Sequence, residues 1–189
     1  MLRSILIAGG ACLMFAAASS QAAYVLTFQQ QGNDVVATGS GSINLAAVNF
    51  QGNIGVSPAV ANPAAGVAEA GSAISAGDYA FVTSGTLTFG PGANAISATS
   101  GTGDFVGLED FDGSLFLPVN YVSGASLSSS ATFAGTTLAG MGFTPGSYTE
   151  TLSLGRAPQD TFTVNVVAPE PASLGMLGMS GLALLRRRR

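Results

Sequence analysis

The chain has 189 residues, no histidine and no lysine, and a formal net charge of -4. Its positive charge is concentrated at the two ends, because residues 24–168 carry nine acidic residues and a single arginine, a net charge of about -8. This balance argues against nucleic acid as a partner, since binding to phosphates requires a basic surface.

The residue types that are missing also limit the chemistry. Without histidine, lysine or a cysteine outside the N-terminal segment, the chain cannot assemble a Ser-His-Asp or Cys-His site, a Schiff base or a histidine-zinc site. A pair of carboxylates, as in glycoside hydrolysis, is the catalytic arrangement that remains. The sequence therefore predicts a non-enzymatic protein with no cofactor, apart from a calcium candidate in the acidic segment.

Residues 1–23 are typical of a secretory signal peptide. Arg3 supplies the charged start, an apolar stretch follows, and Ser20 and Ala22 are placed as a small-residue cleavage site. The alternatives are a first core helix and a lipoprotein signal at Cys12, which lacks the leucine expected three residues upstream. Removal of this segment leaves a chain without cysteine, whose stability has to come from packing and hydrogen bonds.

Residues 24–167 are predicted to form an extracytoplasmic all-β domain. In residues 160–167, Phe162, Val164 and Val166 alternate with polar side chains, which is typical of a strand with one wet face. Similar runs, separated by Gly, Pro, Asn and Asp, occur at 24–31, 41–48, 79–90, 113–119, 126–135 and 147–155. Their spacing favours an antiparallel β-sandwich, Greek-key or jelly-roll-like.

Residues 52–78 are rich in alanine and glycine and carry a weaker pattern. A loop of this length is uncommon inside a compact domain. We expect a strand around Ile54 and Val56 followed by a long loop, with a mobile insertion as the alternative.

Four acidic residues lie close together in the sequence, within the nine residues 104–112. Calcium is bound by carboxylate and carbonyl oxygens on flexible loops, and Asp110, Asp112 and Gly113 follow the spacing that begins such a loop. The pattern is not completed by a later glutamate, so a solvated acidic loop and a catalytic carboxylate pair remain alternatives. The candidate metal ligands are Asp104, Glu109, Asp110 and Asp112.

Residues 168–189 have three parts. Pro169, Glu170 and Pro171 precede an uncharged, mostly apolar run at 172–185, and the chain closes with Arg186, Arg187, Arg188 and Arg189. As a helix the run would span about 21 Å, which is short for a hydrocarbon core of about 30 Å but can cross when arginines snorkel at one end. The arginines would stay on the cytoplasmic side. A buried C-terminal helix with a basic end is the alternative.

The order and spacing of these three parts resemble the PEP-CTERM sorting signal of exported proteins in Gram-negative bacteria. The resemblance is confined to this tail. It implies recognition at Pro169, Glu170 and Pro171 by an exosortase-type membrane enzyme, removal of the tail, and delivery to the cell surface or the exopolysaccharide matrix of a biofilm. In that interpretation the protein passes through an inner-membrane intermediate held by the 172–185 helix.

The sequence thus predicts an exported surface or matrix protein whose partners are the processing enzyme and exopolysaccharide or other surface proteins. The alternative is a secreted carbohydrate-binding or carbohydrate-active domain, with calcium dependence open.

Overall fold

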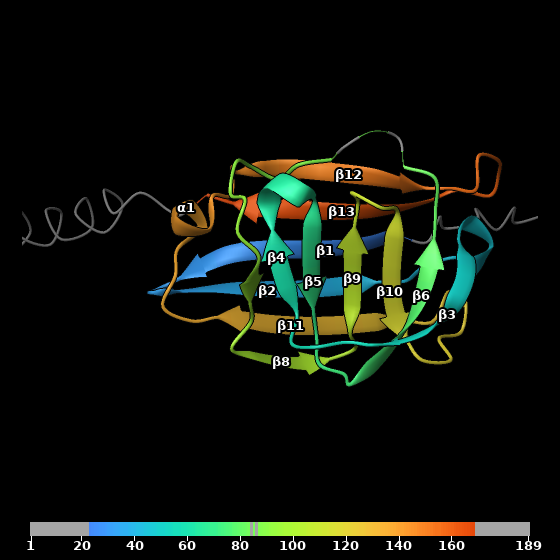
Figure 1. Cartoon of the computed structure of the whole chain (residues 1–189), viewed down its shortest axis with the longest axis horizontal. Helices are drawn as coiled ribbons and strands as arrows, with labels where there is room; N and C mark the ends of the chain where they lie inside the picture. The colour runs from blue at the N-terminus through green and yellow to red at the C-terminus, as the bar shows by residue number, and fades with distance from the viewer. Residues whose placement is uncertain (1–22, 84, 86, 169–189) are drawn as a thin grey trace, which may run out of the picture.

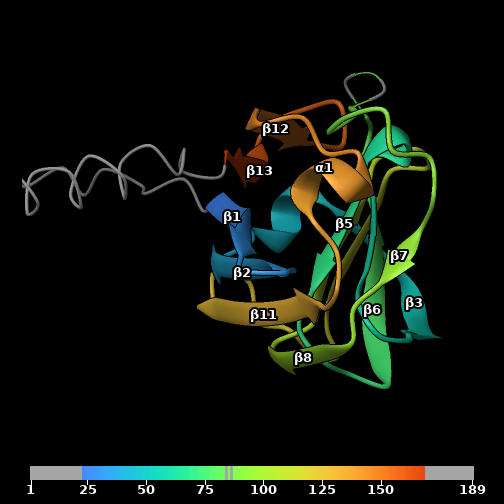
Figure 2. The same ribbon diagram turned by 90° about the vertical axis from the view of Figure 1, so that its left-hand side faces the viewer.

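The computed structural model describes residues 23–83, 85 and 87–168, and these form two β-sheets that face each other (Figures 1 and 2). The signal peptide and the C-terminal tail predicted from the sequence lie outside the described residues. Within the described part of the chain, no helix is long and apolar enough to cross a membrane.

The six-stranded sheet, called sheet A, has the order β12-β13-β1-β2-β11-β8. Its strands, in that order, are Gly146–Leu152, Asp160–Val167, Ala23–Gln31, Asp34–Gly41, Leu127–Phe133 and Ser100–Gly103. The seven-stranded sheet, called sheet B, has the order β3-β6-β10-β9-β5-β4-β7. Its strands are Asn49–Gly55, Ser75–Ala80, Ser114–Pro118, Val106–Glu109, Val67–Ala70, Val60–Asn62 and Ile96–Ser97.

The strands of the two sheets run in different directions. In Figure 1 those of sheet A run across the view and those of sheet B run up and down in front of them, as in orthogonally packed sheets. Three short helical turns join the strands: η1 (Leu45–Ala47), η2 (Pro63–Ala65) and α1 (Leu138–Met141).

One pair of strands corrects the expectation of a purely antiparallel fold. β1 and β13 are parallel neighbours, with Tyr24 opposite Phe162 and Phe28 opposite Val166. Parallel strands need a long connection, and here the connection is the whole body of the domain between them. As a result, Ala23 at the start of β1 and Val167 at the end of β13 lie at opposite ends of this strand pair, measured along the strand direction.

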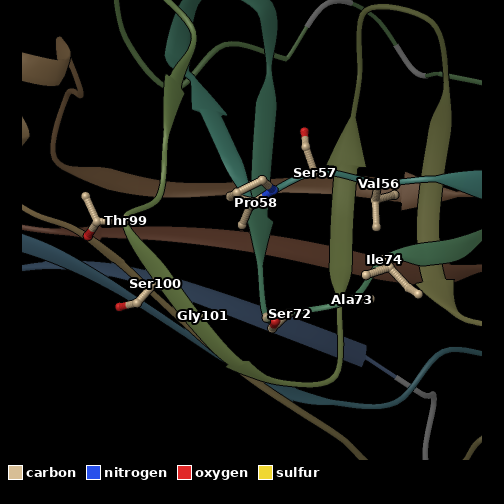
Figure 3. Close-up of a pocket in the computed structure, with 11 residues that line it drawn as sticks. Val56, Ser57, Pro58, Ser72, Ala73, Ile74, Thr99, Ser100 and Gly101 are labelled. Carbon is tan, nitrogen blue, oxygen red and sulfur yellow. The ribbon is translucent and has the colours of Figure 1, made fainter.

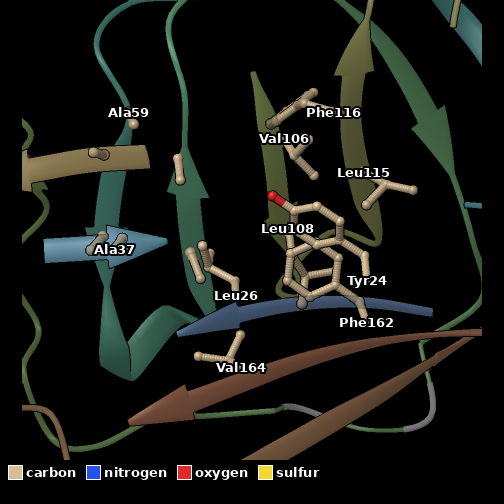
Figure 4. Close-up of a cluster of buried hydrophobic side chains, with 14 of the residues drawn as sticks. Tyr24, Leu26, Ala37, Ala59, Val106, Leu108, Leu115, Phe116, Phe162 and Val164 are labelled. Atoms are coloured by element: carbon tan, nitrogen blue, oxygen red, sulfur yellow. The ribbon is translucent and has the colours of Figure 1, made fainter. Parts of the chain in front are cut away.

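The space between the sheets is filled by an apolar core. Figure 4 shows Tyr24, Leu26 and Phe162 of sheet A together with Leu108 and Leu115 of sheet B. The rings of Tyr24 and Phe162 are 5.1 Å apart between centroids. The alternation predicted for residues 160–167 is confirmed, since Phe162, Val164 and Val166 are buried.

The core also holds a hydrogen bond that depends on a glycine. Tyr24 reaches across β2 to Ser129 on β11, and their hydroxyl groups are hydrogen bonded. A Cβ at Gly39 would lie 1.9 Å from the Tyr24 hydroxyl oxygen, so only glycine leaves room for this side chain. Burial, the largest effect, raises the pKa of Tyr24 to about 12, so the phenol stays protonated.

Most of the predicted strands are present, and two are not. Residues 41–48 fold into the end of β2 and η1, because the Asn44 side chain accepts a hydrogen bond from the Ala46 amide and closes a turn. In the 79–90 run, β6 ends at Ala80, after which Phe81 and Val82 donate to the carbonyls of Gly113 and Ser153 and leave the ladder. The strand β2 (Asp34–Gly41) was not predicted.

The expectation for residues 52–78 is right about the strand near Ile54 and wrong about the long loop. After β3 this segment forms β4, η2, β5 and the start of β6. The connection from β3 to β4, residues 56–59 and called the crossover, passes across the lower part of sheet B (Figure 1). The outer face of this sheet is therefore partly covered.

Candidate functional site

The four acidic residues predicted from the sequence do not converge. Asp104 accepts a hydrogen bond from the Ser128 amide at 2.9 Å and donates its own amide to the Ser128 carbonyl at 2.8 Å. Asp110, which is only 2% exposed, accepts from the Leu87 amide at 2.5 Å. Burial raises the pKa of Asp110, and the bond from Leu87 opposes that rise. Both side chains hold loops in place.

Glu109 and Asp112 lie elsewhere, on the side of sheet B that faces away from sheet A. Asp112 accepts from the Ser114 amide at 3.1 Å. Burial, followed by the charges of Asp112 and Asp78, raises the pKa of Glu109. The described residues contain no group of three or more acidic, histidine or cysteine side chains arranged to hold a metal ion. Calcium binding therefore stays a prediction from the sequence.

Calcium titration tests that prediction. If Asp104, Glu109, Asp110 and Asp112 form a calcium site, millimolar Ca²⁺ should raise the thermal unfolding midpoint of the protein, because a ligand that binds only the folded state stabilises it. Mg²⁺ at equal ionic strength is the control. An unchanged midpoint in calcium would rule out the predicted site.

Glu69 is the residue that sequence reasoning missed. It lies on β5, and its side chain extends over Gly107 of β9 beside the ring of Phe116 on β10. A Cβ at Gly107 would lie 2.9 Å from Cγ of Glu69, so the absence of a side chain at Gly107 leaves the space that the Glu69 side chain occupies. The sequence carries only a weak signal for Glu69, because it is a single glutamate among small residues in a stretch expected to form a loop.

The Glu69 carboxyl group is buried, and no basic residue of the described part of the chain lies beside it. Its exposed fraction is 6%, and Oε2 accepts a hydrogen bond from the Val60 amide at 2.7 Å. Burial raises the pKa of Glu69 to about 7; the Val60 bond opposes the rise and the charge of Glu109 adds to it. The carboxyl group thus gains or loses its proton near neutral pH.

The strand register brings a second acid into line with Glu69. Asp78 of β6 pairs with Phe116, Phe116 with Gly107, and Gly107 with Glu69, which places all of them in one row across the sheet. Oδ1 of Asp78 is a buried oxygen without a hydrogen-bond partner in the structure. Burial, and then the charge of Asp112, raises the pKa of Asp78. We call this surface the outer acidic face: Glu69, Asp78, Glu109 and Asp112.

Among the residues that the structure describes, no base lies on the outer acidic face to balance its charge. Arg156 is the one basic residue in the described part of the chain, and it lies in the exposed loop between β12 and β13 of the other sheet. The charges on this face therefore repel one another, and this repulsion adds to burial in raising the pKa values of Glu109 and Asp78.

Two cavities flank the crossover. The acidic cavity, of about 260 Å³, is lined by Glu69 and Glu109, by Phe105 and Phe116, and by Val60 and residues 54–57. A second cavity of about 320 Å³ is uncharged and shares Val56 and Ser57 with the first (Figure 3). Hydroxyl groups and small side chains line it, including Ser57, Ser72, Thr99 and Ser100.

Sheet A presents a different outer surface. One row of uncharged polar side chains crosses all six of its strands, in the order Ser147, Asn165, Thr27, Thr38, Ser130 and Thr102. The hydroxyl oxygens of Thr149 and Thr163, in the neighbouring row, are 2.9 Å apart. Strands are about 4.8 Å apart, so hydroxyl and amide groups repeat at that interval across a neutral surface.

Comparison of the chain with models of known protein families, with curated proteins and with solved structures found no match.

Proposed function

We propose that the chain is an exported, non-enzymatic surface or matrix protein, in which a β-sandwich domain is sorted through its PEP-CTERM tail by an exosortase-type enzyme. The observation that carries this proposal is the tail itself: the triplet Pro169, Glu170 and Pro171, the apolar run at 172–185 and the four terminal arginines. Each part has a separate physical role in recognition, membrane crossing and orientation.

The position of the tail supports the proposal. β13 ends at Val167, so Ala168 alone separates the last strand from the Pro-Glu-Pro triplet. Residues before a proline favour an extended backbone, which suits a segment that a processing enzyme has to reach. Removal of the tail after Val167 would leave every described strand intact.

The neutral outer surface of sheet A supports a matrix setting. Its row of hydroxyl and amide groups, from Ser147 to Thr102, offers donors and acceptors to the hydroxyl groups of a polysaccharide without charge repulsion. Many weak contacts of this kind on one surface can hold a multivalent polymer.

Intact-mass analysis of the protein fractionated from its host tests the proposal. The mature species should begin near Ala23 or Tyr24, end near the Pro-Glu-Pro triplet, and be recovered from the cell surface or matrix. Glu170→Gln in the same host should reduce processing if the carboxylate is recognised. The control has to be an acidic residue without a structural role, which excludes Asp160 because it accepts hydrogen bonds from the amides of Asn44 and Thr161.

Asp34→Asn serves as the control instead, because the asparagine oxygen can still accept the Gly135 amide that Asp34 holds at 2.8 Å. A surface form that retains Arg186–Arg189 would contradict the processing step and indicate a permanent membrane anchor.

A further inference from the structure

We propose that the acidic cavity beside the crossover is a binding site for a primary ammonium group carried on a small organic body. This inference goes beyond export and sorting and does not depend on them. It rests on the position of Glu69, on the cavity that this side chain lines, and on the charges around it.

The first argument is the state of the Glu69 carboxyl group. The side chain is more than nine-tenths buried and lines the cavity, yet Val60 is the only described residue that donates a hydrogen bond to it, through Oε2. A carboxyl group usually gains several partners when it is buried. Oε1 is thus available to a ligand that enters the cavity.

The second argument is the sign of the surrounding charge. Glu109 lines the same cavity, Asp78 lies in the same row as Glu69, and Asp112 lies near both Glu109 and Asp78. No lysine or arginine of the described residues balances them on this sheet. A cation is the ligand that would relieve this repulsion.

The third argument concerns which cation fits. The described residues hold no group arranged for a metal ion. Apart from Gly55 and the hydroxyl group of Ser57, the rest of the cavity wall is apolar, with Ile54, Val56, Val60, Phe105 and Phe116. Hard divalent ions need six or more oxygen ligands, whereas an ammonium group needs about three acceptors and leaves the apolar wall to contact its carbon atoms.

Binding of an ammonium group has a consequence that can be measured. The pKa of Glu69 is about 7 in the free protein. A cation beside the carboxyl group favours its ionised form and lowers that pKa. Near neutral pH the binding of an ammonium group should therefore release part of a proton to the buffer for each ligand bound.

Calorimetric titration of the full chain, kept in a mild non-ionic detergent, tests the proposal. The probes are butylammonium chloride and glucosamine hydrochloride, with butanol and glucose as their uncharged counterparts and calcium chloride as the metal probe. Titrations in two buffers of different ionisation enthalpy give the number of protons released. Saturable binding of either amine with proton release supports the proposal, and the preferred amine shows whether the body is an alkyl chain or a sugar.

Variants distinguish amine binding at Glu69 from non-specific attraction of a cation to an acidic protein. Glu69→Gln should weaken amine binding by roughly tenfold or more and abolish proton release. Glu109→Gln should weaken binding while the proton is still released, because Glu69 remains. Asp34→Asn removes one negative charge far from the cavity and should leave both quantities unchanged.

Three outcomes would overturn the proposal: equal binding of the uncharged counterparts, binding that Glu69→Gln leaves intact, or Glu69-dependent binding of calcium without binding of either amine. Unfolding curves recorded for each variant establish that a loss of binding does not come from a loss of structure.

Discussion

Replacing Phe28 with alanine is expected to lower the free energy of unfolding by about 3–5 kcal/mol. Phe28 is fully buried on β1, and its ring centroid lies 4.6 Å from that of Phe143 and 6.0 Å from that of Phe133. These rings come from β11, β1 and the segment after α1, so the truncation would leave a cavity between elements that cannot easily collapse together.

The effect should be large relative to the total stability. Domains of this size are stable by about 5–15 kcal/mol. The described residues contain no cysteine and hence no disulfide that could compensate. Urea unfolding followed by circular dichroism gives the change in free energy.

Phe111→Ala is the matched control. Phe111 lies in the turn between β9 and β10 and is 59% exposed, so its loss should change the free energy of unfolding by no more than about 0.5 kcal/mol. Similar losses for Phe28→Ala and Phe111→Ala would show that the aromatic cluster around Phe28 does not form as described.

Replacing Glu69 with glutamine is expected to stabilise the protein at pH 8 by about 3 kcal/mol. The pKa of Glu69 rises from 4.5 to about 7 on folding. A group with a raised pKa contributes stability that is fully present below its unfolded pKa and is lost as the pH rises through its folded pKa. The contribution of Glu69 should therefore disappear between pH 4.5 and about 7.

Glutamine removes this dependence without removing the local hydrogen bond. Its side-chain oxygen can still accept the Val60 amide that Oε2 of Glu69 now accepts at 2.7 Å. Wild type and Glu69→Gln should have similar stability near pH 4.5 and diverge as the pH rises. Urea unfolding at pH 4.5, 6 and 8 measures the difference.

The stability of the Glu69→Gln variant should still fall as the pH rises, although less steeply than that of wild type. Burial also raises the pKa values of Asp78, Glu109, Asp110 and Asp160, and their contributions have the same sign. Parallel curves for wild type and Glu69→Gln would mean that Glu69 is not buried as the structure has it.

The strands at both ends of the domain could be read from the sequence, because each has one buried and one wet face. In β13 the buried side chains alternate strictly with exposed or half-buried ones, and β11 follows the same pattern. Side chains that alternate in polarity report the two faces directly. The same reasoning failed for β5, where Val67, Ala68, Glu69 and Ala70 are all buried.

The reason is that burial on both faces of β5 is a property of the tertiary structure. Sheet A covers one face, and Glu69 on the other lies against Gly107 and Phe116 near the crossover. Glycine and alanine at residues 52–78 carry too little side chain to show a period, so the sequence suggested a loop where β4 and β5 form. The parallel pairing of β1 with β13, which joins residues more than 130 apart, has no local signal either.

The sequence by itself determined three features of this protein: an acidic body without histidine or lysine, strands with one solvent-exposed face, and a tail that resembles a sorting signal. It also located Glu109 and Asp112 in the segment that contributes to the outer acidic face. Only the tertiary structure decided which acids meet. Asp104 and Asp110 turn away to hold backbone amides, while the register of β5, β9, β10 and β6 brings Glu69 and Asp78 into one row. Hydrogen bonds between strands that are distant in the sequence decide which residues lie side by side in a sheet, and the local sequence does not show this pairing.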